Sequence, residues 1–318
     1  MKKLIVKSII YSVLILLALE LMVRAFHLYQ QYPPYIIDDK NVEVNAPNQN
    51  GYYVTGNRRM NFAEYYINKS GFNSYREFEP TADGIEVALI GDSFIEGFHQ
   101  NYYNSTGRKI ENLLEEKVQV YEYGYSGYDF ADQVHLISAY KEQFELIDHV
   151  IIYLKFYMDL ERGTYEPNHY RVDLQNSLSF RLQDNIKLIA YAKGIGVLRP
   201  FRNLKDRILG TQRVHREYID DHASEEDTKK YLDNFKTLVK TYNIDKTKTT
   251  FLLDGKKTSP LFLDYCNSNG YKYVDYGPTL DNSKTPTTLI YDQHWNNHGR
   301  NLIAEVLAKY IRNHLSIQ

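Results

Sequence analysis

The chain has 318 residues, of which 43% are hydrophobic and 25% are charged, and its formal net charge at pH 7 is −2. This composition is typical of a globular protein with a sizeable core and excludes disorder along the whole chain. The small negative charge, without a basic stretch interleaved with aromatic residues, argues against nucleic acid as a partner. The single cysteine, Cys266, excludes an intrachain disulfide and a cysteine-based metal cluster.

The first 26 residues have the composition of a membrane anchor. Three lysines precede an apolar stretch, and a helix over residues 4–26 would exceed the about 20 residues that cross a bilayer. Glu20 and Arg24 lie four apart and are expected to pair on this helix. No small-residue cleavage site follows, which disfavours a cleaved signal peptide, and apolar residues all round the helix disfavour a surface helix. The lysines predict a single pass through the cytoplasmic membrane, with the amino terminus inside and the globular domain outside the cytoplasm.

Residues 27–80 are predicted to form a linker and a small β-rich lead-in. The region is polar and aromatic, and Pro33-Pro34 indicates an extended segment that leaves the membrane. The alternating pieces at 52–54 and 65–67 predict short strands, paired as a hairpin beside the main sheet.

Apolar strands alternate with helices over residues 81–318. Strands are predicted at 86–90, 118–123, 149–154, 249–253 and 271–275. Helices are predicted at 106–117, 130–146, 225–242 and 297–315. An insertion with short helices is expected at about 161–222. The alternation predicts an α/β fold with a mostly parallel five-stranded sheet and helices on both faces.

A serine lies directly behind the first of these strands, in the turn Gly91-Asp92-Ser93-Phe94. Ligands bind at the carboxyl ends of parallel strands, so Ser93 is a candidate nucleophile, provided that a base reaches it. The segment before the last predicted helix supplies Asp292 and His294. Residues two apart on an extended segment point to the same side, so the carboxylate is expected to orient the imidazole.

Each motif has a simpler explanation when it stands alone. Gly-Asp-Ser is common as a turn, and Asp-x-His often caps a helix. A metal site made of Asp292, His294 and His298 is a further alternative, since two histidines four apart resemble a zinc motif. The neighbouring glycine and asparagines argue against a regular helix through both histidines. The combination favours catalysis, because each motif lies where a site at the end of a sheet requires it.

Three separated blocks of the sequence resemble the SGNH/GDSL hydrolases. The first is the turn at 91–94 and the second is the glycine-rich turn at 123–128. The last, at 292–299, is similar to a D-x-H-W-N-x-x-G variant of membrane-anchored members and polysaccharide O-acetyltransferase relatives. Residues 68–73 resemble the N-x-x-G-F lead-in of such members. The order of the blocks makes the resemblance specific over about residues 60–315.

This resemblance implies a flavodoxin-like, three-layer α/β/α sandwich and an activity of hydrolysis or transfer of an acyl ester, with no cofactor and no metal. Carried over to this sequence, it makes Ser93 the nucleophile, His294 the general base and Asp292 the residue that orients the base. The backbone N–H groups of Ser93 and Gly124 would stabilise the oxyanion.

One block departs from the family pattern. Where the family has an asparagine donor after the third strand, this chain has Met158 and Asp159, and the thioether of Met158 cannot donate a hydrogen bond. Loss of one such donor costs about 2.7–4 kcal/mol of transition-state stabilisation. Lys155, Tyr157 or a residue of the insertion are candidate replacements. Glu122 also stands where the family often has asparagine.

The anchor and the set Ser93, Asp292 and His294 together predict an esterase or O-acyltransferase that acts on acyl esters of cell-envelope glycans. The expected partners are an acylated small molecule or glycan as substrate, the membrane through the amino-terminal helix, and a membrane protein that donates the acyl group if the reaction is a transfer. The alternative is a degenerate, non-catalytic envelope protein that keeps the fold and binds a glycan or protein partner.

Overall fold

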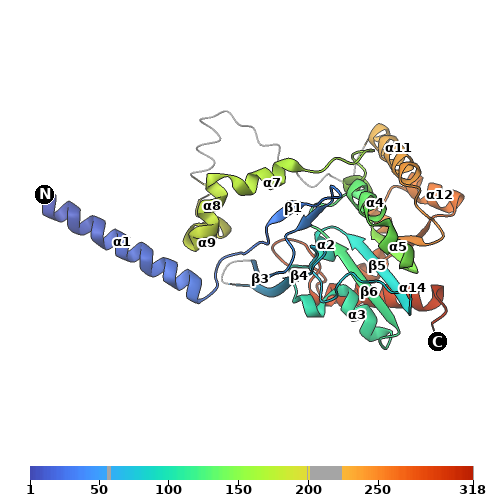
Figure 1. Cartoon of the computed structure of the whole chain (residues 1–318), viewed down its shortest axis with the longest axis horizontal. Helices are drawn as coiled ribbons and strands as arrows, with labels where there is room; N and C mark the ends of the chain where they lie inside the picture. The colour runs from blue at the N-terminus through green and yellow to red at the C-terminus, as the bar shows by residue number, and fades with distance from the viewer. Residues whose placement is uncertain (56–58, 199, 201–223, 318) are drawn as a thin grey trace.

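A five-stranded parallel sheet forms the centre of the protein in the computed structural model, which describes residues 1–55, 59–198, 200 and 224–317 (Figure 1). The strands are β5 (Ile85–Gly91), β6 (Val118–Gly124), β7 (His149–Tyr153), β8 (Thr249–Leu253) and β9 (Lys272–Asp275). Their order across the sheet is β6-β5-β7-β8-β9, and every neighbouring pair is parallel. This is the flavodoxin-like order of a doubly wound sheet, so the predicted fold class is confirmed.

Helices cover both faces of the sheet because successive strand residues point to opposite sides. Val87 and Leu89 of β5 join a core with α3 and α14, whereas Ala88 and Ile90 join a second core with α4, α11 and α12. The helices of the domain are α3 (Thr106–Leu113), α4 (Phe130–Ala139), α5 (Lys141–Leu146), α11 (Glu225–Thr241), α12 (Pro260–Asn269) and α14 (Asn297–His314). Short turns of helix are α2 (Ser93–Glu96), α6 (Phe156–Asp159), α13 (Gly277–Asp281), η1 (Tyr102–Asn104) and η2 (Gly255–Lys257).

The single helix predicted at 130–146 is wrong, because the chain breaks at Tyr140 into α4 and α5. Tyr140 leaves the helical conformation, with φ −110° and ψ 35°. Its hydroxyl donates to the Asp38 carboxylate, and the Lys40 ammonium lies 4.3 Å from the centre of its ring. Contacts with the lead-in, about 100 residues earlier in the chain, therefore accompany the break, and the local sequence contains no sign of it.

The amino-terminal helix α1 (Lys2–Ala25) extends away from the rest of the protein (Figure 1). It is long and apolar enough to cross a membrane, and its most apolar stretch is not buried against the rest of the protein. A signal sequence would have the same properties. The predicted pairing of Glu20 with Arg24 is present, at 2.6 Å.

The lead-in consists of two antiparallel pairs, separate from the main sheet. One pair is β1 (Tyr35–Ile37) with β2 (Glu43–Asn45), and the other is the hairpin of β3 (Gln49–Thr55) with β4 (Asn61–Ile67). The hairpin contains both predicted strands. Tyr53 stacks on Phe98 with 5.3 Å between ring centres, so the hairpin packs against the segment that follows α2.

The expected insertion at about 161–222 carries three short helices in its described part. They are α7 (His169–Asn176), α8 (Leu178–Asn185) and α9 (Lys187–Gly194). Residues 199 and 201–222 of the insertion lie outside the described residues.

Gly124 generates a prediction about stability, because β6 ends where the backbone of α2 crosses it. A Cβ at this position would lie 1.9 Å from the Glu96 backbone nitrogen, whereas a Cβ at Gly84 would meet no atom within 4 Å. We expect Gly124→Ala to lower the free energy of unfolding by about 1–3 kcal/mol through overpacking. The matched control Gly84→Ala is expected to stay within about 0.5 kcal/mol of the parent. Urea unfolding of the full chain in detergent measures both, and equal midpoints for the two variants would contradict the expectation.

Candidate active site

Ser93 is the first residue of α2 and follows β5 directly. Asp92 caps the helix, because its Oδ1 accepts a hydrogen bond from the Phe94 backbone nitrogen at 2.9 Å. The helix ends after one turn at Gly97, whose φ of 69° lies in the left-handed region that glycine tolerates. The backbone N–H groups at the start of a helix have no acceptor inside it, so that of Ser93 is available as a donor at the edge of the sheet.

The structure brings Ser93, His294 and Asp292 together. The Ser93 Oγ lies 2.8 Å from Nε2 of His294. The other ring nitrogen, Nδ1, faces Oδ1 of Asp292 at 3.4 Å. A carboxylate beside Nδ1 favours the tautomer with its proton there, which leaves Nε2 to accept the serine hydroxyl proton. A nucleophile, a base and an orienting carboxylate in this sequence are the arrangement that serine-dependent acyl transfer requires.

The reason given for the pairing of Asp292 with His294 is wrong, because the segment is a tight turn and not extended. Gln293 has a φ of 62°, and Oδ1 of Asp292 accepts the His294 backbone N–H at 3.1 Å. The turn is closed by a bridge between Thr288 and Trp295. The side chain of Asp292 therefore fixes the backbone of His294 as well as its ring.

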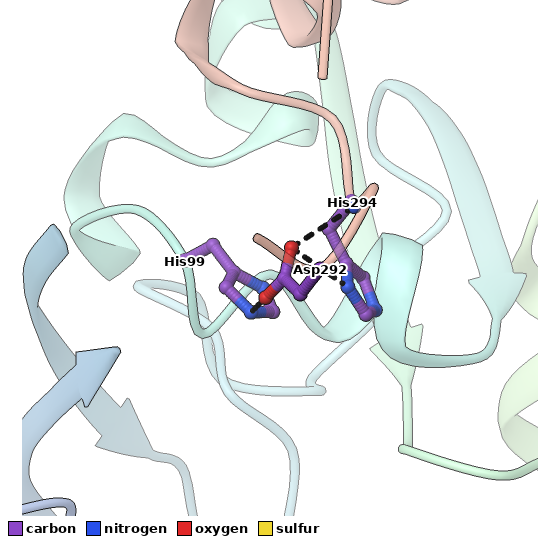
Figure 2. Close-up of side chains that lie close together, drawn as sticks. All are labelled: His99, Asp292 and His294. Atoms are coloured by element: carbon purple, nitrogen blue, oxygen red, sulfur yellow. Dashed lines mark hydrogen bonds and ion pairs between the residues drawn. The ribbon is translucent and has the colours of Figure 1, made fainter. Parts of the chain in front are cut away.

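A second histidine, which the sequence did not single out, completes the cluster in Figure 2. Nε2 of His99 lies 2.6 Å from Oδ2 of Asp292, so the carboxylate stands between two imidazoles. The His99 side chain is only 5% exposed, and its ring stacks on that of His294 with 4.3 Å between centres. The position of His99, six residues after Ser93, gave no signal in the sequence, since its partner is almost 200 residues away.

The charge states of the cluster follow from burial and hydrogen bonding. Burial acts to raise the pKa of Asp292, but hydrogen bonds from His294 and His99 outweigh it and hold that pKa well below its usual value. Burial lowers the pKa of His99, although its hydrogen bond to Asp292 opposes the change. A neutral His99 donates a hydrogen bond from its Nε2–H to Oδ2 of the ionised Asp292. Ser93, His294, Asp292 and His99 therefore form one line of polar contacts, of which the step from Nδ1 of His294 to Oδ1 of Asp292 is the longest, at 3.4 Å.

The alternative of a metal site changes with this geometry. His298 does not join Asp292 and His294, because its Nε2 lies 2.9 Å from Oγ of Ser283. His99 takes its place in the set of candidate ligand residues. Its ring is inclined only 24° to that of His294, so the in-plane lone pairs of the two rings run side by side and do not converge on one point. Each oxygen of Asp292 also faces a different ring, which favours a line of polar contacts over a metal centre.

The one-turn helix α2 is held in place by side chains from distant parts of the chain. The Lys155 ammonium, after β7, pairs with the Asp92 carboxylate. Nη1 of Arg300, a buried residue of α14, donates to the Phe94 carbonyl at 2.7 Å. Asn73 of the lead-in donates from Nδ2 to the Glu96 carbonyl at 2.7 Å. Two carbonyls of α2 and the side chain of its capping residue thus have fixed partners.

The residues predicted around the oxyanion differ in what the structure shows for them. Gly124 lies against the first turn of α2, where a side chain would collide with the Glu96 backbone. Met158 exposes 49% of its surface and supplies no donor. Asp159 is buried and accepts the Lys155 backbone N–H at 2.7 Å, and burial raises its pKa to about 8. It therefore closes the turn after β7, which is a structural role.

Glu122, the other departure from the family pattern, also has a structural partner. Its Oε1 accepts the Gly107 backbone N–H at 2.8 Å, at the start of α3. The side chain is buried, and burial raises its pKa to about 7 despite hydrogen bonds from Ser105 and Gly107. Glu122 thus anchors α3 to β6.

No family model and no curated protein matches the chain. Solved structures that it resembles include a member of the lipolytic protein G-D-S-L family from Veillonella parvula, at 14% identity over 71% of this chain and 97% of that one, with a TM-score of 0.39. A carbohydrate acetylesterase family member from Sinorhizobium meliloti matches at 12% identity over 73% and 99%, with a TM-score of 0.37. The psychrotrophic esterase EstA from Pseudoalteromonas sp. matches at 12% over 73% and 98%, with a TM-score of 0.42. Similarity at this level does not assign a family or an activity to the chain.

The line of polar contacts from Ser93 to His99 predicts that His99 controls the reactivity of Ser93. His99→Phe keeps an aromatic ring against His294 but removes the donor to Asp292. A hydrogen bond to a charged group contributes about 1.5–3 kcal/mol, so we expect labelling of Ser93 by a fluorophosphonate to slow about tenfold or more. The control His314→Phe, at the far end of α14, should label like the parent. An unchanged labelling rate for His99→Phe would contradict this role.

Glu122 predicts a pH dependence of stability. Because its pKa rises from 4.5 to about 7 on folding, the folded chain keeps a proton between these values that the unfolded chain has lost. Stability from this group is present below pH 4.5 and is lost as the pH rises to about 7, by at most about 3 kcal/mol. Glu122→Gln keeps an acceptor for Gly107 and removes the titration. The variant should gain stability over the parent between pH 5 and pH 8 in urea unfolding, and a constant difference would rule out this titration.

Proposed function

We propose that the chain is a serine-dependent esterase or O-acyltransferase that acts on acyl esters. The observation that carries the proposal is the 2.8 Å contact of the Ser93 Oγ with Nε2 of His294, backed by the carboxylate of Asp292. A serine hydroxyl is a poor nucleophile unless a base takes its proton in this way. The three residues come from the two ends of the domain, and their convergence at the carboxyl edge of β5 supports a catalytic role.

The reaction follows from this geometry in two halves. The Ser93 Oγ attacks the ester carbonyl carbon while its proton passes to Nε2 of His294, and Asp292 stabilises the resulting imidazolium. Collapse of the tetrahedral intermediate breaks the bond to the alcohol oxygen, which takes the proton back from His294. In the second half, water or an acceptor hydroxyl gives its proton to His294 and its oxygen attacks the acyl group, which releases Ser93.

Stabilisation of the oxyanion is the weaker part of the proposed machinery. The proposed donors are the backbone N–H groups of Ser93 and Gly124. Lys155 stands where strand three meets the site, and its ammonium pairs with Asp92 beside the nucleophile. It thereby links β7 to α2 through an ion pair, and this contact is not itself a hydrogen bond to the oxyanion. With two backbone donors in place of three groups, the rate should fall about 100- to 1000-fold below that of a complete site.

The proposed substrate is an O-acyl group of a cell-envelope glycan. Support comes from α1, which is able to cross the cytoplasmic membrane once and leave the domain outside the cytoplasm, and from the resemblance of the last block to glycan-modifying relatives. Transfer would further require a membrane protein as acyl donor.

Hydrolysis and transfer differ only in the acceptor of the second half-reaction. Incubation of the full chain with an acyl donor and a glycan acceptor separates them, because transfer yields acylated glycan whereas hydrolysis yields the free acid alone.

A nucleophile variant tests the proposal itself. We expect the purified full chain in detergent to release acid from a short-chain aryl ester, and Ser93→Ala to lower kcat by at least about 1000-fold, since the covalent half-reaction is lost. The matched control Ser268→Ala, an exposed serine on α12, should keep the parent rate. If the parent released no acyl group and Ser93 resisted a serine-directed phosphonate, the non-catalytic alternative would replace this proposal.

A further inference from the structure

Helix α9 is attached to the end of α1 by a group of hydrogen bonds. Oε1 of Glu20 accepts the Lys187 backbone N–H at 3.0 Å, and Oε2 accepts that of Leu188 at 2.7 Å. Arg24 donates from Nη2 to the Asn185 carbonyl at 2.7 Å. The carboxylate thus occupies the positive end of α9, while the guanidinium meets the negative end of α8. Figure 1 shows α8 and α9 beside the last turns of α1.

The attachment fixes the depth of α8 and α9 relative to a bilayer that α1 would cross. Glu20 lies five residues before the end of α1, which corresponds to about 7.5 Å along a helix. A span of about 20 residues that starts near Leu4 ends near Arg24. Glu20 therefore sits close to the boundary between hydrocarbon and headgroups. Its ionised form is tolerable there because Arg24 and two backbone N–H groups satisfy it.

Four exposed apolar residues, called the apolar row from here on, recur in the sequence from α7 to the residue after α8. Its members are spaced by four residues, and their exposed fractions are 45% for Leu174, 75% for Leu178, 43% for Leu182 and 39% for Ile186. Leu178 and Leu182 share one face of α8, since residues four apart on a helix are neighbours. Residues 178–193 also carry three basic side chains and one acidic one. An exposed apolar helix face, on a segment with an excess of basic residues and next to a helix able to span a membrane, is the pattern of an interfacial helix.

We propose that α8, with Leu178 and Leu182 foremost, lies in the lipid interface of the leaflet from which α1 emerges. This inference rests on the proposed membrane location of α1. The occupant of the apolar row is the bilayer, because Glu20 and Arg24 hold the row at the depth where α1 leaves the hydrocarbon. Anionic lipids suit the excess of basic residues.

The interfacial contact would fix the height of the active site above the membrane. Helix α7 connects α8 to the site, because Arg171 donates to the Ser126 carbonyl in the glycine-rich turn after β6. The guanidinium of Arg171 also lies over the rings of Tyr35, at 4.1 Å, and Tyr125, at 4.8 Å. Eight residues of α7 span about 12 Å. The connection ties α8 to the turn at Ser126, whose backbone N–H donates to Glu96, three residues after Ser93.

Depth-dependent quenching in vesicles tests the proposal. In the full chain with Cys266→Ala, single cysteines are introduced as Leu178→Cys or Leu182→Cys and labelled with bimane. The chain is reconstituted in vesicles of phosphatidylethanolamine and phosphatidylglycerol. We expect lipids with a doxyl group at carbon 5 to quench both labels strongly, and aqueous iodide to quench them at least about threefold less than a label at Lys309→Cys, an exposed site on α14.

A label at Leu14→Cys, in the middle of α1, separates the two levels of the argument. If the label at 14 is quenched by lipid while the labels at 178 and 182 are as open to iodide as the label at 309, the interfacial placement of α8 is overturned and the anchor stands. If the label at 14 is itself open to iodide, the membrane location fails and the present inference falls with it. The esterase test on Ser93→Ala is independent of both results.

Discussion

The position of the one-turn helix α2 is the constraint on which the candidate site depends. A helix of four residues has no stability of its own, because nucleation costs more than one turn of hydrogen bonds returns. Its place is therefore set from outside, by the ion pair of Lys155 with Asp92, by the bond from Arg300 to the Phe94 carbonyl and by the bond from Asn73 to the Glu96 carbonyl. These supports come from β7, from α14 and from the lead-in. The position of Ser93 is well defined because the residues around it in α2 are held by several separate contacts.

Arg300 also couples the nucleophile to the base. It is the fourth residue of α14, and the turn that carries Asp292 and His294 immediately precedes this helix. When Arg300 binds the Phe94 carbonyl, the start of α14 and the start of α2 become one unit. Burial of Arg300 lowers its pKa to about 10, partly offset by Glu122, so the guanidinium stays charged at neutral pH. The distance between Ser93 and His294 thus depends on a contact that neither residue makes.

The sequence predicts the parts of the fold that local patterns encode. The apolar run at 86–90 and the serine cap of the helix at 225–242 give β5 and α11 almost to the residue, because burial and capping act over one element. Ser93, Asp292 and His294 were found because each lies at the end of such an element. The break at Tyr140 and the places of His99 and Arg300 were missed, since each depends on a partner about 100 to 200 residues away. The turn at Gln293 could not be predicted for a different reason. Glutamine is not a residue type that indicates a positive φ, so the residues Asp-Gln-His look the same in a turn and in an extended segment.

The regions that look accessory in the sequence therefore complete the site. Glu96, three residues after Ser93, is buried and accepts hydrogen bonds from the Ser126 backbone and from Asn45 of the lead-in. Burial raises its pKa to about 7, which hydrogen bonds from Ser126 and Asn45 only partly oppose. Ser126 is in turn held by Arg171 of α7. Loss of the lead-in or of α7 would leave a buried carboxylate with fewer partners directly beneath the nucleophile, a costly arrangement. The α/β core places Ser93 at the carboxyl end of β5. The hydrogen bonds that satisfy the buried Glu96 carboxylate next to it depend on the lead-in and on α7, which lie outside that core.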